Sequence, residues 1–236
     1  MIRTFAVAVS AACLISGCRA STPGPTTVPL PRAAAPSPQE ADAFNRLYRA
    51  RKDSAMRRFT AADVAFMQGM IHHHAQALVM SRLAGPNGAS AAVRTLSARI
   101  INAQSDEIDV MQHWLTARGQ VVPTLQEMGG TLLVHMPGGH GDHMAHMPGM
   151  LSDAQLDSLR AARGQAFDRL FLTFMIQHHK GAVAMVEALF ARDGAGQDEA
   201  VFKFASDAQV DQGTEIARME GMLATMTATT QRAPAP

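Results

Sequence analysis

Apolar residues recur along most of the chain at alternating spacings of three and four, which is the pattern of amphipathic helices. The pattern predicts five helical segments, over residues 40–58, 60–84, 90–118, 152–191 and 197–227. Residues with capping-box spacing stand at two of the expected starts, Thr60 to Asp63 and Ser152 to Gln155. Gly164 is expected to interrupt the fourth segment. No strand pattern is evident, so we predict an all-α fold.

Two of the predicted helices carry the same motif. The stretch that begins at Asp63 returns at Asp168, and the inward-facing stripe reads Phe, Met, His, Ala, Met in both copies. The stripes occupy residues 66, 70, 73, 77 and 80 and residues 171, 175, 178, 182 and 185. A second motif, 104–111, returns at 212–219 on the following helices. A duplicated helical hairpin predicts an antiparallel four-helix bundle with an extra N-terminal helix.

The stripe places His73 and His178 inside the bundle, with His74 and His179 at its edge. On the partner helices, two glutamines fall on the apolar face and two glutamates at its border, namely Gln104, Gln212, Glu107 and Glu215. A buried imidazole or amide is costly unless a partner bonds it. Matched histidines and Gln or Glu side chains therefore occupy the interior of both halves.

Two interpretations of these residues stay open. In the first, each histidine hydrogen-bonds a Gln or Glu on the neighbouring helix, and the pairs fix the helix register. In the second, a metal is held at the bundle centre by residues from both halves, drawn from His73, His74, Met70, Glu107, His178, His179, Met175 and Glu215. A bundle-centred metal oxidoreductase is a third interpretation, which the lack of a Glu-x-x-His motif disfavours.

The long connection over residues 121–150 is rich in Gly, Pro, Met and His. Its candidate ligands are His135, Met136, His140, His143, Met144, His146, Met147 and Met150. Thioether suits Cu(I), and imidazole suits copper in either oxidation state, so the composition favours Cu(I) or Cu(II) over hard cations. The alternatives are zinc held by histidine and a spacer in which these residues are incidental.

The N-terminus has the features of an export signal. Arg3 precedes an apolar stretch, and the sequence that ends at Cys18 is similar to a bacterial lipobox. We expect a signal peptide over residues 1–17 and lipidation of Cys18, with a plain signal peptide or a short membrane anchor as the alternatives. The predicted location is the cell envelope, with attachment to the membrane through the lipid alone.

The remaining boundaries follow from composition. We expect a flexible Pro/Ser/Thr-rich tether over residues 18–39, a bundle domain over 40–228 and a disordered tail over 229–236. Within the domain, the first half is 60–118 and the second half is 152–228, on either side of the Met/His-rich connection.

Charge and motif content limit the classes of function. The 21 Lys and Arg nearly balance the 20 Asp and Glu, which gives no electrostatic reason to expect a nucleic-acid partner. No nucleophile triad, phosphate loop or nucleotide motif stands out, so we do not expect an enzyme. The expected partners are a metal ion and a copper-transfer protein.

The repeated Met-Ile-x-His-His segments and their Gln-x-x-Glu-Ile-x-x-Met partners resemble the bacterial envelope family named domain of unknown function 305. The resemblance covers about residues 60–226. It implies a ferritin-like four-helix bundle, export from the cytoplasm and, for some members, copper binding connected with copper tolerance. The corresponding motif positions are His73, His74, Gln104, Glu107, His178, His179, Gln212 and Glu215. His72 stands opposite Gln177, so the two half-sites differ.

These observations predict an envelope lipoprotein that binds copper, or a similar soft metal, for buffering, tolerance or transfer. The alternative from another class is a metal-free helical interaction module whose buried His/Gln pairs are structural.

Overall fold

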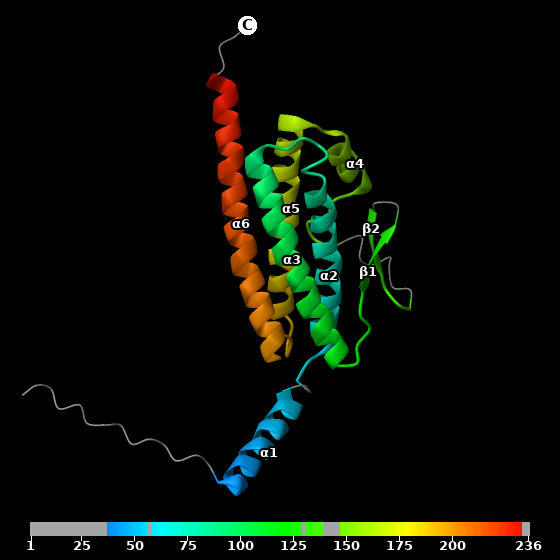
Figure 1. Ribbon diagram of the computed structural model, residues 1–236, viewed down its shortest axis with the longest axis vertical. Coiled ribbons are helices and arrows are strands. Elements are labelled where there is room, and N and C mark those ends of the chain that lie inside the picture. The colour runs from blue at the N-terminus through cyan, green and yellow to red at the C-terminus, as the bar shows by residue number, and fades with distance from the viewer. Residues whose placement is uncertain (1–36, 56–57, 129–130, 139–146, 233–236) are drawn as a thin grey trace, which may run out of the picture. The chain divides into compact units, whose positions relative to one another are not determined.

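The computed structural model describes residues 37–55, 58–128, 131–138 and 147–232 (Figure 1). Long helices make up most of this part of the chain, as the hydrophobic pattern predicts. The elements are α1 (Pro38–Ala55), α2 (Ala61–Arg82), α3 (Ala91–Ala117), β1 (Thr124–Met128), β2 (Thr131–His135), α4 (Asp153–Ala161), α5 (Gly164–Phe190) and α6 (Glu199–Arg232). The predicted signal peptide with Cys18, and most of the tether, lie outside the described residues.

The predicted helix starts are confirmed. Thr60 and Asp63 form a reciprocal capping box at the start of α2, and Ser152 and Gln155 form one at the start of α4. The predicted interruption before Gly164 separates α4 from α5, and this glycine has a φ of +55°. The last helix, α6, continues to Arg232, beyond its expected end at 227.

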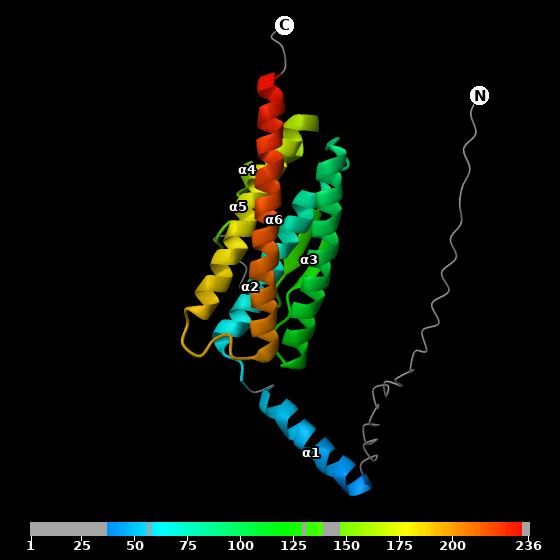
Figure 2. The same cartoon turned by 90° about the vertical axis from the view of Figure 1, so that its left-hand side faces the viewer.

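Four long helices, α2, α3, α5 and α6, pack side by side (Figures 1 and 2). Helices α2 and α3 form one hairpin, α5 and α6 form the other, and α2 packs against α5 to join them. The duplicated motifs therefore lie in two equivalent hairpins. The described side chains of helix α1 are mostly exposed.

The two hairpins are also tied together by one aspartate from each repeat copy. Asp63 on α2 accepts a hydrogen bond from the backbone nitrogen of Gly196, in the α5–α6 connection. Asp168 on α5 accepts from the backbone nitrogen of Ser90, in the α2–α3 connection. Both aspartates are buried. The first residue of each motif thus fixes the turn of the opposite hairpin.

The expectation that the chain has no strands is wrong. Strands β1 and β2 pair as an antiparallel hairpin, with Thr124 opposite His135 and Met128 opposite Thr131. Strand β2 lies against α2. The apolar side chains Leu125, Leu132 and Val134 are partly buried against the bundle core, which stabilises a hairpin too short to fold alone.

The apolar core consists of two clusters at different heights along the helices. One contains Phe66, Met70, Met111, Trp114 and Val186, and the other contains Met80, Ile100, Phe171, Met175 and Met219. Between these two levels, each of the four helices contributes buried polar side chains. We call this set the histidine layer, and it comprises His73, His74, Gln104, His178, His179 and Gln212.

Candidate metal site

The histidine layer is centred on two imidazoles in close, tilted contact. The ring centroids of His73 on α2 and His178 on α5 are 3.8 Å apart, with their planes inclined by 38°. Both side chains are fully buried, as the helical stripe predicts. Because the two residues are equivalent in the repeat, this contact joins the two halves of the fold at their common motif.

The neighbouring histidines each bond a glutamate of the same hairpin. His74 Nε2 is 2.5 Å from Glu107 Oε2, and His179 Nε2 is 2.6 Å from Glu215 Oε2. Both histidines are fully buried rather than at an edge, while each glutamate side chain is 23% exposed. The first interpretation, in which histidines pair with Gln or Glu, therefore describes the outer histidines.

The inner histidines have different partners. His73 Nε2 is 3.1 Å from the carbonyl oxygen of Pro148, and its Nδ1 has no hydrogen-bond partner in the described part of the chain. Neither ring nitrogen of His178 has a hydrogen-bond partner there, nor does the side-chain amide of Gln104. Buried polar atoms without partners are rare because their desolvation is not offset. The unpartnered atoms of His73, His178 and Gln104 therefore make the centre of the layer a candidate binding site.

Burial keeps the inner pair neutral. It lowers the pKa of His73 to about 3, and the nearby charge of His74 adds to this effect. Burial also places the pKa of His178 well below its ordinary value, with further lowering by His73 and His179. A neutral imidazole has one nitrogen lone pair free to accept a proton, a hydrogen bond or a metal ion.

A pocket of about 250 Å³ lies between α3 and α6, beside the histidine layer. Its lining residues are Arg99, Ala103, Gln104, Glu107, Asp211, Gln212, Thr214 and Glu215. Burial, together with the nearby carboxylates of Glu107, Asp207 and Glu215, raises the pKa of Asp211. The glutamates of both His–Glu pairs therefore line the same pocket, together with Asp211.

The end of the Met/His-rich connection returns to the layer from the opposite side. Residues 147–151, which we call the docked segment, lie against α2 and α5. Gly149 packs on Gly181 so closely that a Cβ on Gly181 would lie 2.0 Å from the oxygen of Pro148. Only glycine fits at position 181 while the segment is docked, and this contact places the Pro148 carbonyl beside His73.

Two glutamines hold the docked segment through its backbone. The amide of Gln76 donates to the Leu151 oxygen at 3.1 Å and accepts from the Leu151 nitrogen at 2.7 Å. Gln177 Nε2 donates to the oxygens of Gly149 and Met150 at 3.4 and 3.5 Å. The Met147–Met150 end of the connection is therefore a fixed part of the bundle.

The docking positions are among those at which the two repeat copies differ. Gly69, His72 and Gln76 of α2 correspond to Phe174, Gln177 and Gly181 of α5. The segment contacts Gly69, Gln76, Gln177 and Gly181 directly. The mismatch between His72 and Gln177 is one sign of this asymmetry in the sequence, and the neighbouring mismatches Gly69/Phe174 and Gln76/Gly181 are further signs.

The other sequence-predicted ligands are distributed as follows. Met70 and Met175 are fully buried and belong to the two apolar clusters. His135 ends β2 with an exposed side chain, and Met136 after it is partly buried. The remaining candidates, His140, His143, Met144 and His146, lie outside the described residues. Within the described ranges, no three His, Cys, Asp or Glu side chains are grouped so that they could hold a metal ion.

A larger cavity, of about 550 Å³, lies away from the layer, near the starts of α3 and α5 and the end of α6. Val93, Gly164, Asp168 and Met222 are among its lining residues. None of the residues that the sequence singled out as ligands lines it. The chemistry of the predicted site is therefore confined to the histidine layer and the Met/His-rich connection.

The fold and the layer define a class: a duplicated helical bundle with paired histidines buried at its centre. Residues 63–223 match the family described as domain of unknown function (DUF305), and the chain belongs to this family. A comparison with curated proteins finds no match.

Solved structures of the same family are similar to this chain. A DUF305 fragment from Deinococcus radiodurans is 32% identical, with a TM-score of 0.57, and the match covers 71% of this chain and 98% of the fragment. A DUF305 protein from Streptomyces coelicolor, described as secreted, is 26% identical, with a TM-score of 0.57 and coverage of 70% and 94%.

A third relative, CopM, has been solved with copper bound. Its Cu(II)-bound form is 28% identical to this chain, with a TM-score of 0.52, and the match covers 69% of this chain and 96% of CopM. CopM has also been solved in a Cu(I)-bound form. A copper-binding protein is therefore among the structural relatives of the chain.

Among the described helices, none combines the length and the apolar character that crossing a membrane requires.

Proposed function

We propose that this protein is a copper-binding lipoprotein of the cell envelope that buffers copper or passes it to another protein. The observation that carries the proposal is the Met/His-rich stretch over residues 135–150, whose end is docked on the histidine layer with the Pro148 carbonyl beside His73. Captured copper would thus be held next to buried, neutral imidazoles.

Ligand chemistry and family both support copper. Thioether and neutral imidazole are soft or borderline ligands, which select Cu(I) and also accept Cu(II). The relative CopM is described as binding both copper ions. We further propose that the role is not enzymatic, because copper held by a Met/His-rich stretch and a packed layer serves binding and transfer rather than catalysis.

A metal-free structural module is the second candidate, and one observation favours it. The two His–Glu pairs, His74–Glu107 and His179–Glu215, satisfy the outer histidines without a metal. In this alternative the layer fixes the register of the two hairpins, because any slip would leave buried imidazoles unpaired.

Anaerobic competition titration with Cu(I) distinguishes the two. The mature chain from residue 18 onward is used with Cys18→Ser, because an unlipidated thiol would itself bind Cu(I). It is compared with a variant in which the His and Met residues of 135–150 are changed to Gln and Leu. We expect the intact chain to bind at least one Cu(I) tightly and the altered chain to lose most of this capacity.

A second variant, His73→Ala with His178→Ala, tests whether the inner histidines of the layer are copper ligands or structural residues. Loss of copper with a retained helical circular dichroism spectrum makes the inner histidines ligands. Unchanged copper binding with a lower melting temperature makes them structural. No binding by the intact chain contradicts the copper proposal as a whole and leaves the structural module.

A further inference from the structure

His72 has a half-buried imidazole that the histidine layer does not use. It precedes His73 on α2, and the second repeat copy has Gln177 in its place. Its Nε2 atom is buried and has no hydrogen-bond partner in the described part of the chain. The ring is thus a desolvated nitrogen ligand without an assigned role.

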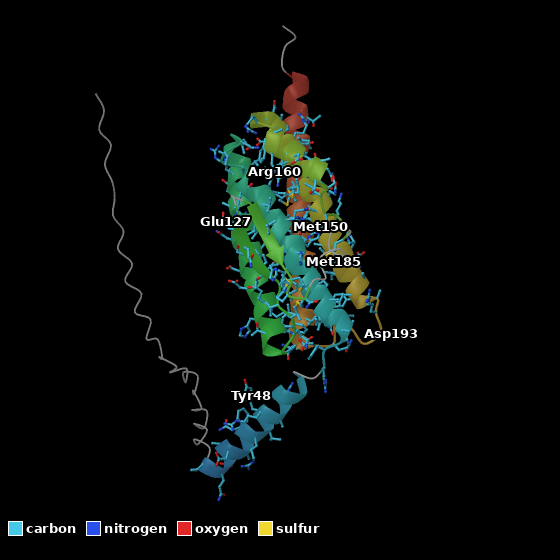
Figure 3. All side chains as sticks on the ribbon, turned by 90° about the vertical axis from the view of Figure 1, so that its right-hand side faces the viewer. Tyr48, Glu127, Met150, Arg160, Met185 and Asp193 are labelled. Atoms are coloured by element: carbon cyan, nitrogen blue, oxygen red, sulfur yellow. The ribbon has the colours of Figure 1, made fainter. Side chains whose placement is uncertain are left out.

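Two methionines occupy the helix surface one turn before this histidine. A Cβ on Gly69 would lie 3.2 Å from the sulfur of Met147 and 3.4 Å from the ε-methyl group of Met185. Met147 comes from the docked segment and Met185 from α5, so both side-chain ends share the space above one glycine. Figure 3 labels Met185 together with Met150, on the face to which the segment returns.

His72 lies on the same face of α2 as Gly69, because the two residues are three apart in the helix. Residues three apart lie on one face of a helix, and helical side chains point toward the N-terminal end. The side chain of His72 is therefore directed over the turn that contains Gly69, where the two methionines meet. Because Gly69 has no side chain, the ends of the two methionine side chains can approach α2 at this position.

The docked backbone fixes the position of the Met147 sulfur. The Met147 carbonyl accepts a hydrogen bond from the Met150 nitrogen at 3.3 Å, and the next residue, Pro148, contacts His73. Gly149 is locked against Gly181. The sulfur is therefore presented by a packed turn, which lowers the conformational entropy lost on binding an ion.

We propose that His72, Met147 and Met185 form a Cu(I) site between α2, α5 and the docked segment. Two thioethers and one neutral imidazole are a soft donor set without a carboxylate, which favours a monovalent soft ion over hard cations. This site rests on the proposed copper-binding function and deepens it by naming a ligand set. The second repeat copy has no equivalent of this donor set, since Phe174 and Gln177 replace Gly69 and His72.

Three substitutions test the donor set. His72→Gln introduces the residue of the second copy, and Met147→Leu and Met185→Leu remove sulfur with little change in volume. The matched controls are His113→Gln, an exposed residue of α3, and Met222→Leu, a partly buried residue of α6. We expect each ligand variant to lower the affinity for one Cu(I) ion by at least about tenfold. Loss of a residue that only hydrogen-bonds a metal ligand already has an effect of that size. The controls should match the unsubstituted chain.

Methyl NMR gives a second readout that does not require substitution. With ¹³C-labelled methionine methyl groups in the Cys18→Ser chain, one equivalent of Ag(I), a redox-inert soft probe, should shift the Met147 and Met185 signals together. Two results would overturn this site alone, provided that the intact chain binds copper. One is that the Met147 and Met185 signals do not move on addition of Ag(I), and the other is that the ligand variants keep the Cu(I) affinity of the intact chain. An intact chain that binds no Cu(I) would overturn both this site and the proposed function.

Discussion

His178 and His179 are adjacent in the sequence and both are fully buried, yet their surroundings differ. His179 bonds Glu215 at 2.6 Å, whereas neither ring nitrogen of His178 has a hydrogen-bond partner in the described part of the chain. In the apo protein, His178 therefore carries a desolvation cost that, among the described residues, only an interaction with the backbone of His73 reduces. A residue retained at such a cost is a candidate for function rather than for stability.

Substitution of these two neighbours should have opposite effects on the apo protein. His178→Leu removes an unpartnered imidazole and should raise the free energy of unfolding by about 1 kcal/mol. His179→Leu removes a hydrogen bond to a carboxylate and should lower it by about 2 kcal/mol. Urea denaturation of both variants measures the difference. A marked destabilisation by His178→Leu would contradict this prediction. It would show that contacts of His178 stabilise the fold by more than the desolvation of its imidazole costs.

The stability of the apo protein should fall in mild acid. Burial lowers the pKa of His73 to about 3 and that of His178 well below its ordinary value. Below about pH 6.5 the unfolded chain therefore binds protons that the folded chain does not, so each histidine lowers stability by up to about 1.4 kcal/mol per pH unit as the pH falls.

Urea denaturation between pH 7.5 and 5 measures this slope, and His178→Leu is its control because it removes one of the two groups. The slope should be smaller in the variant. Equal slopes in the two proteins would show that His178 is protonated in the folded state.

The inner histidines could be predicted from the sequence, but their partners could not. A helical period of three and four places His73 and His178 on the buried stripe whatever the rest of the chain does. The partner of His73 is the main-chain oxygen of Pro148, far away along the chain. A backbone carbonyl has the same chemistry at every residue, so no side-chain pattern indicates that contact.

At the scale of elements, helices were predictable and the hairpin was not. The capping boxes and Gly164 mark helix boundaries through local chemistry. The sequence Thr-Leu-Gln-Glu-Met of β1 has only two apolar residues and alternates weakly, and it becomes a strand because Leu125 packs on the core. The pair Gly129–Gly130 between the strands, a dipeptide typical of two-residue hairpin turns, was the signal available in the sequence.

The docked segment should be the element most sensitive to a small substitution. Gly181→Ala would place a methyl group 2.0 Å from the Pro148 oxygen, so we expect the segment to leave α5 and one copper site to be lost. Gly213→Ala in α6 is the control, because a Cβ there meets nothing within 4 Å and should stabilise the helix by up to about 1 kcal/mol.

Thermal unfolding and limited proteolysis report this difference. The Gly181→Ala chain should melt at a lower temperature and be cleaved near residue 147, whereas Gly213→Ala should resist both. Equal protease resistance of the two variants would mean that the docked segment is not held by its contact with Gly181.

At the scale of the whole molecule, the duplication determines the architecture and the departures from it determine the site. Equivalent hairpins bring His73 against His178, and Asp63 and Asp168 tie each half to the turn of the other. The Met/His-rich connection is present once, and its end docks where the copies differ. The repeat therefore explains the fold, whereas the unrepeated residues carry the proposed copper chemistry.

The proposed location is tested with the whole chain. Cys18→Ser should move the protein from the membrane fraction to the soluble envelope fraction, because a lipid on Cys18 is the proposed attachment. Metabolic labelling with a fatty-acid analogue should mark the unsubstituted chain and not the variant. Equal partitioning of the two proteins would contradict lipidation at this residue.

X-ray absorption of the mature Cys18→Ser chain, loaded anaerobically with Cu(I) and freed of excess metal, tests the copper proposal at the metal itself. We predict a retained Cu(I) ion with both sulfur and nitrogen in its first shell, since thiols are absent from that chain and methionine is its only source of sulfur. A protein that retains no copper, or copper surrounded by nitrogen and oxygen alone, would contradict the proposal.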